Sequence, residues 1–77
     1  MYVKINATVP VDLKLFKQMR EEKKIGQAMI NEALGKSSAY VSRMERGDIK
    51  NIPIESVDVI QEVMKLTREE RKRIFGV

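Results

Sequence analysis

The stretch SSAYVSRMERG, residues 37–47, gathers the side chains of this chain that are best suited to chemistry. Its apolar residues Val41 and Met44 stand three apart, so they share one face of a helix. Small or basic side chains are left for the other face: Ser38, Ala39, Ser42, Arg43 and Arg46. Arginine donates hydrogen bonds in a planar fork that fits base edges and phosphates, and short side chains allow close approach. The pattern predicts a helix face that meets a polyanion.

Other kinds of site lack their usual residues. The 77-residue sequence has no cysteine and no histidine, which removes disulfides, thiolate metal sites and the commonest general base. The neighbouring carboxylates of Glu21 and Glu22, and of Glu69 and Glu70, would point in different directions on a helix and make poor acid–base pairs. We therefore expect no enzyme activity, no metal and no cofactor.

The composition fits a small nucleic-acid-binding protein. Fifteen basic residues stand against eleven acidic ones, giving a net charge of +4, which favours polyanionic partners but also suits any soluble helical surface. The length predicts one domain with a marginal core. No apolar run approaches the ~20 residues of a membrane span, and no secretory signal is recognisable. We expect a cytoplasmic protein without membrane contact.

The first residues predict a β-strand. Residues 2–9, YVKINATV, alternate with a period of two, and Pro10 ends the run. One side carries the apolar set Val3, Ile5, Ala7 and Val9. The other side includes Lys4, Asn6 and Thr8. No other segment has a strand pattern, so we expect no partner for this strand within the chain. The predicted organisation is a strand or dimerisation arm at 1–10 and a helical domain at 11–77.

Five helices are predicted after the strand, over residues 13–24, 27–34, 38–46, 54–66 and 68–75. Asp12 and Ser37 are the expected N-caps of the first and third helices. Gly26, Gly35 and Gly47 separate the first four helices. The sequence TREE at 67–70 has the form of a capping box. Four methionines are expected to fill the core: Met19, Met29, Met44 and Met64.

A short helix, a turn at Gly35 and a second short helix have the form of a helix-turn-helix motif. Residues 19–53, MREEKKIGQAMINEALGKSSAYVSRMERGDIKNIP, resemble the phage repressor/Cro-like (Xre) helix-turn-helix family, and 12–75 do so more loosely. The resemblance implies a mainly α, five-helix repressor-like domain that binds double-stranded DNA. The leading strand and Asn31, where the family usually has alanine, depart from that pattern.

The resemblance also implies roles for individual residues. The groove-facing positions, expected to contact bases, are Ser38, Ala39, Ser42 and Arg43. The expected phosphate contacts are Gln27, Arg46, Lys50 and Asn51. Arg20 and Glu45 match a structural arginine–glutamate pair that ties the first helix to the recognition helix. Glu45 would then be neutralised by Arg20 and need not repel DNA.

Two other interpretations stay open. A ribbon-helix-helix repressor would explain the strand, with Lys4, Asn6 and Thr8 reading bases, but it leaves SSAYVSRMERG and two helices unexplained. A protein-binding module, such as an antirepressor or assembly factor, would use the apolar strand face and Ile74 and Phe75. We favour a sequence-specific DNA-binding regulator that occupies an operator as a homodimer. The expected dimer contact is the antiparallel pairing of two copies of the strand through Val3, Ile5, Ala7 and Val9.

Overall fold

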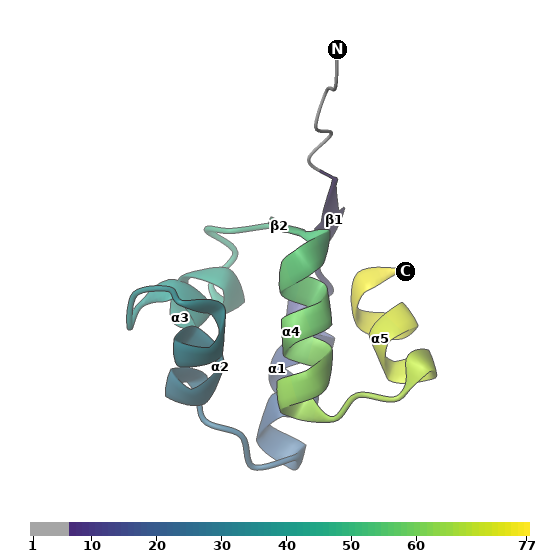
Figure 1. The fold of residues 1–77 in the computed structure, drawn as a ribbon, viewed down its shortest axis with the longest axis horizontal. Helices are drawn as coiled ribbons and strands as arrows, with labels where there is room; N and C mark the ends of the chain where they lie inside the picture. Colours follow the sequence, from purple (N-terminus) through teal and green to yellow (C-terminus); the bar gives the residue numbers. More distant parts are fainter. Residues whose placement is uncertain (1–6) are drawn as a thin grey trace.

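The computed structural model describes residues 7–77 of the chain, and helices dominate it (Figure 1). The elements in chain order are β1 Thr8–Pro10, α1 Leu13–Glu22, α2 Gln27–Leu34, α3 Tyr40–Glu45, β2 Asn51–Pro53, α4 Ile54–Met64 and α5 Arg68–Phe75. Five helices occur within 7–77, each inside its predicted range, which confirms the predicted fold class. Within the same residues no helix is long and apolar enough to cross a membrane.

The core lies where α1 and α4 meet the other helices. The α2–α3 pair packs on one side of α1 and α4, and α5 packs on the other (Figure 1). Phe16 of α1 and Phe75 of α5 meet edge to face with ring centroids 6.5 Å apart, a geometry that the aromatic quadrupole favours. Ile30 and Ile60 bring α2 and α4 into the same fully buried cluster. All the helices described thus share one hydrophobic core.

Two of the helix N-caps are the residues that the sequence predicted. Asp12 accepts a hydrogen bond from the Leu15 amide and caps α1, and Thr67 forms the predicted capping box with Glu70. The backbone N–H of Thr67 and the neighbouring Lys23 ammonium, 3.3 Å away, lower the pKa of Glu70. This corner also joins the end of α1 to α5.

The third helix begins later than predicted. Residues 38 and 39 form a turn, and α3 starts at Tyr40 instead of residue 38. Ser37 does not cap it with its side chain; the N-cap is Ala39, which makes no side-chain hydrogen bond. The prediction was wrong because a partner distant in sequence, Asn31, replaces the local cap.

The predicted absence of a strand partner is also wrong. β1 pairs antiparallel with β2, with Thr8 opposite Pro53 and Val9 opposite Ile52. Both Val9 and Ile52 are buried, so the pair covers one end of the helical core. The sequence hid β2 because three residues ending in proline are too few to show alternation. Val3 and Ile5, the first two residues of the expected dimer face, lie outside the described residues.

Prolines limit further strand pairing at this ribbon. The amide of Val11 donates to Lys50, and that of Ile54 donates to Ala7. In this register Val9 and Ile52 face each other, and the backbone groups of the alternate residues, including Pro10 and Pro53, point away from the partner strand. A proline has no N–H to offer an added strand, so each edge lacks one donor. Val9 faces the chain's own core and is not an exposed dimer contact.

Two expectations about apolar surfaces are corrected by burial. Met29, expected in the core, is 56% exposed on α2. Ile74 and Phe75, expected as interaction surfaces of a protein-binding module, are almost fully buried beneath α5. Both side chains belong to the chain's own core and are not available to a partner.

Candidate nucleic-acid interface

Gly35 makes the turn between α2 and α3 possible. It closes α2 in a left-handed conformation with φ of +66°, which glycine adopts without the strain of a Cβ atom. The amides of Gly35 and Lys36 donate back to carbonyls of Glu32 and Asn31, at 3.0 and 2.9 Å. The end of α2 is therefore closed, and the chain turns toward α3 within five residues.

Asn31 fastens the start of α3 to α2. Its side chain, from a residue only 4% exposed, donates from Nδ2 to the Ser38 carbonyl at 3.1 Å. Its Oδ1 accepts from the buried Val41 amide at 2.9 Å. That amide is one of the N–H groups at a helix start that have no partner within the helix. Asn31, the residue that departs from the family pattern, thus acts as a cap supplied by the preceding helix.

The end of α3 is fastened by charge. The Glu45 carboxylate accepts from Nε of Arg20 at 2.7 Å and from its Nη2 at 3.1 Å. Gln27 donates to the same carboxylate at 2.9 Å, and a third Arg20 nitrogen donates to the Ile25 carbonyl. The Arg20 and Glu45 side chains are only 10% and 6% exposed. The network links α1, the start of α2 and α3, and it neutralises Glu45.

Between these two attachments, α3 separates an inner from an outer face. Val41 and Met44 are fully buried, whereas Arg43 and Arg46 are exposed. Within residues 7–77 the Arg43 side chain makes no ion pair or hydrogen bond, so its guanidinium is available to a ligand. The outer face therefore offers donors from a rigidly held backbone.

The residues expected to contact bases do not all lie within α3. Ser38 and Ala39 are in the turn before it, and the Ser38 carbonyl is already held by Asn31. Ser42 is half-buried, and its hydroxyl donates to the Ala39 carbonyl at 3.0 Å. Only Arg43 is both exposed and within the helix. The structure gathers these four residues at the start and outer face of α3.

The residues expected to contact phosphates are more dispersed. Gln27 belongs to the Glu45 network. Arg46 pairs with Asp48 at 3.0 Å in the open, with side chains 68% and 58% exposed, and such pairs are worth only ~0–1 kcal/mol. A phosphate can therefore compete for Arg46. Lys50 and Asn51 are exposed at the entry to β2.

The sequence analysis missed Lys36 and Tyr40 near the same surface. The Lys36 ammonium lies 5.4 Å from the centre of the Tyr40 ring, a cation–π arrangement. Burial raises the pKa of Tyr40 above its ordinary value, and its phenol, protonated at neutral pH in any case, can donate a hydrogen bond. A spacing of four residues would have suggested a contact between the two side chains if both lay on one helix. Because residues 36–39 form the turn after Gly35, there was no reason in the sequence to expect that contact.

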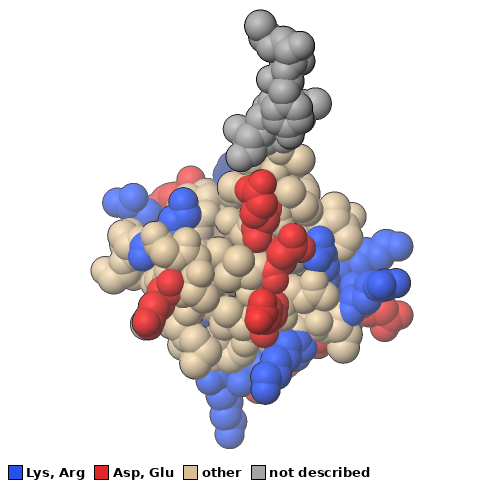
Figure 2. Space-filling model, viewed as in Figure 1, with Lys and Arg blue, Asp and Glu red and all other residues tan. Residues whose placement is uncertain are grey.

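Charge is distributed unevenly over the molecule. Glu55, Asp58 and Glu62 are exposed on α4, and acidic side chains run along this helix in the view of Figure 2. Helix α3 packs against α1 and α2. A polyanion that approaches α3 would thus meet the positive charges of Arg43 and Arg46. A polyanion that approaches the exposed face of α4 would be repelled by its carboxylates. The charge pattern disfavours contact of a polyanion with the exposed face of α4.

Comparisons with known proteins agree with this geometry. The family model described as helix-turn-helix matches residues 16–71, from α1 into α5. No curated protein and no solved structure matches the chain. The match includes both helices and the turn between them, so the ribbon-helix-helix interpretation of the fold is wrong.

The first prediction concerns the network at the end of α3. Replacing Arg20 or Glu45 alone by alanine leaves a buried charge unpaired and should lower the free energy of unfolding by ~3–5 kcal/mol. The double variant should lose less than the sum of the two single changes, because neither charge remains. Urea unfolding of all four proteins measures the coupling. The exposed pair Arg46–Asp48 is the control, with a coupling of ~0–1 kcal/mol expected; strict additivity for Arg20 and Glu45 would refute their interaction.

The second prediction concerns the cap from α2. Asn31→Ala removes both hydrogen bonds and leaves the buried Val41 amide without its acceptor, so it should lower the free energy of unfolding by ~1–3 kcal/mol. Hydrogen exchange at the Val41 amide should accelerate more than at amides of α5. Glu32→Ala, at an exposed position of the same helix, should leave both measurements nearly unchanged. Unaltered protection at Val41 would show that Asn31 does not cap α3.

Proposed function

We propose that this chain, which belongs to the phage repressor/Cro-like helix-turn-helix family, is a transcriptional regulator that binds a specific operator in double-stranded DNA. In this class of domain, the second helix of the motif lies in the major groove and the first helix crosses the backbone. α3 takes the place of the second helix and α2 that of the first. The regulator requires no cofactor in this proposal.

One observation carries the proposal: Arg43 is exposed, has no side-chain partner among residues 7–77, and lies on a short helix whose two ends are both held by other helices. Asn31 holds the start of α3 and Arg20 holds its end through Glu45. A side chain that reads a base must approach from a fixed backbone, because a bidentate contact tolerates little displacement. The anchoring of α3 supports its use as a recognition helix more directly than net charge does.

The proposed base contacts divide into one donor and three small residues. Arg43 would make a two-pronged contact to guanine O6 and N7. Ser38, Ala39 and Ser42 would let the start of α3 approach the base edges and the thymine methyl group. Phosphate contacts from Gln27, Arg46, Lys50 and Asn51 would fix the register without reading sequence. Gln27 has a further amide hydrogen to offer while it stays bonded to Glu45.

We further propose that two copies occupy one operator. A single α3 reads only a few base pairs, and two-fold related domains gain affinity by binding half-sites about 34 Å apart. Val9 would not contribute, since it is buried in its own chain. Ala7, exposed beside β1, is the described residue of the expected dimer face that is free for such a contact.

The third prediction tests base reading. Arg43→Ala should weaken binding to the preferred site by ~1–3 kcal/mol and relax the choice at one base pair. Sites selected from random DNA, and then all single-base variants of the best site, provide the measurement by fluorescence anisotropy. Arg73→Ala, at an exposed position of α5, is the matched control and should leave the preference unchanged. An unaltered preference profile for Arg43→Ala would remove it from the readers and would leave the proposed function without its main support.

The fourth prediction tests backbone contact. Lys50→Ala should weaken binding to all DNA sequences alike, because phosphate contacts carry no sequence information. The slope of log K against log salt should become shallower by about one unit. Lys72→Ala, exposed on α5, serves as the control with an unchanged slope. A shift in sequence preference at a constant slope would assign Lys50 to the bases.

A further inference from the structure

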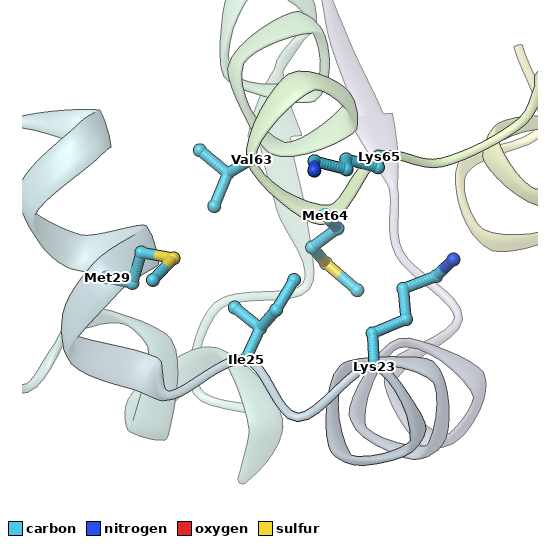
Figure 3. Close-up of a pocket in the computed structure, with 6 residues that line it drawn as sticks. All are labelled: Lys23, Ile25, Met29, Val63, Met64 and Lys65. Atoms are coloured by element: carbon cyan, nitrogen blue, oxygen red, sulfur yellow. The ribbon is translucent and has the colours of Figure 1, made fainter.

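An apolar groove lies between the start of α2 and the end of α4, away from α3. Its apolar lining residues are Ile25, Met29, Val63 and Met64, and Lys23 and Lys65 complete it. The four apolar side chains converge on the space between the two helices, with the two lysines on the α1 and α5 side (Figure 3). The volume of the groove is about 430 Å³. No residue of α3 lines it.

Met29 makes this groove unusual on the described surface. It is 56% exposed, and the other large apolar side chain exposed to a similar extent within 7–77 is Val77. Met29 projects from a helix whose inner face is already filled by Ile30. A flexible thioether beside an apolar floor can adapt to many side-chain shapes.

One of the two lysines that line the groove, Lys65, occupies a left-handed backbone position. Lys65 caps α4 with φ of +51°, and Lys24, in the turn beside Lys23, has φ of +58°. Glycine would adopt this left-handed conformation with less strain. Lysine at both positions places positive charge at the ends of two helices. Lys65 makes no ion pair within residues 7–77, whereas Lys23 is 3.3 Å from Glu70.

We propose that this groove docks an amphipathic acidic segment of a partner protein. Apolar side chains of that segment enter between Met29 and Val63, and its carboxylates meet Lys65 and Lys23 at the rim. The groove is open along one side, so it would leave much of a small molecule in water, whereas ligand pockets cover most of their ligand. An amphipathic segment instead lays only one face into a groove. The exposed α4 carboxylates Glu55, Asp58 and Glu62 are not among the lining residues.

Docking at this groove is separate from DNA contact at α3. The partner would touch the α1–α2 turn, the outer side of α2 and the end of α4. Arg43, Arg46 and Lys50 take no part in the groove, and Gln27, between Ile25 and Met29 at the start of α2, is bonded to Glu45 and is not a lining residue. A regulator bound to its operator would therefore still present the groove to another protein. The inference goes beyond the proposed function, since it assigns a protein partner to a surface that DNA does not need.

The fifth prediction uses three matched synthetic peptides and the full chain. Each peptide has twelve residues with leucines at helical spacing, and the remaining positions carry glutamate, glutamine or lysine. Fluorescence anisotropy should give the order glutamate, then glutamine, then lysine, with the glutamate peptide binding at least about tenfold more tightly than the lysine peptide. Amide shifts in ¹⁵N spectra should change at Ile25, Met29 and Val63 on addition of the glutamate peptide.

Single substitutions test whether the glutamate peptide binds in the groove. Met29→Gln should weaken the glutamate peptide about fivefold by removing apolar contact, while Ala33→Gln, also exposed on α2, should have no effect. Lys65→Gln should weaken the glutamate peptide and leave the glutamine peptide unchanged, with Lys72→Gln as its control. Binding of operator DNA should be the same for Met29→Gln and the unaltered chain, so a failure of docking is distinct from a failure of DNA recognition.

Four results would overturn the proposal. These are equal binding of the lysine peptide, full binding by Met29→Gln, no binding of any peptide at millimolar concentration, and displacement of the glutamate peptide by DNA. The last result would assign the rim lysines to phosphate contact.

Discussion

The ion pair between Arg20 and Glu45 is the constraint on which the recognition surface depends. A carboxylate on a helix that approaches DNA would oppose binding, and a buried carboxylate without a partner would oppose folding. Both problems are solved by one contact, because Arg20 and Gln27 surround Glu45 with three donated hydrogen bonds. The same contact fixes α3 relative to α1. The same group of side chains thus neutralises the carboxylate and positions the helix.

Helix α3 needs this support because it has only six residues. An isolated helix of that length is unstable in water, since nucleation fixes several residues before hydrogen bonds compensate. Its buried face contributes only Val41 and Met44 to the core. The remaining stability must come from its ends, where Asn31 supplies the missing cap and Arg20 holds Glu45. Two of the residues that would contact bases, Ser42 and Arg43, lie between these two fixed points.

The sequence predicted the parts of the fold that depend on local pattern. The five helices, the Gly35 turn and the Thr67 capping box follow from spacing and from residue preferences within a few neighbours. The pairing of β1 with β2 did not, because its partners are more than forty positions apart and β2 is too short to show a period. The later start of α3 and the exposure of Met29 were missed for a related reason. Both depend on what another helix contributes, and helical spacing alone does not contain that information.

The contacts of the candidate site also include some that the sequence predicted and some that it did not. Resemblance to a family placed Arg20 opposite Glu45, and the two side chains meet in the structure. It also marked Asn31 as a departure from the family pattern, but it could not identify the Ser38 carbonyl and the Val41 amide as its partners. The consequence is specific to this chain. With alanine at position 31, α3 would need its cap from the turn, where Ala39 offers none. With asparagine at position 31, the turn does not have to supply the cap of α3. Ser38 and Ala39 can then be small residues that suit close approach to DNA.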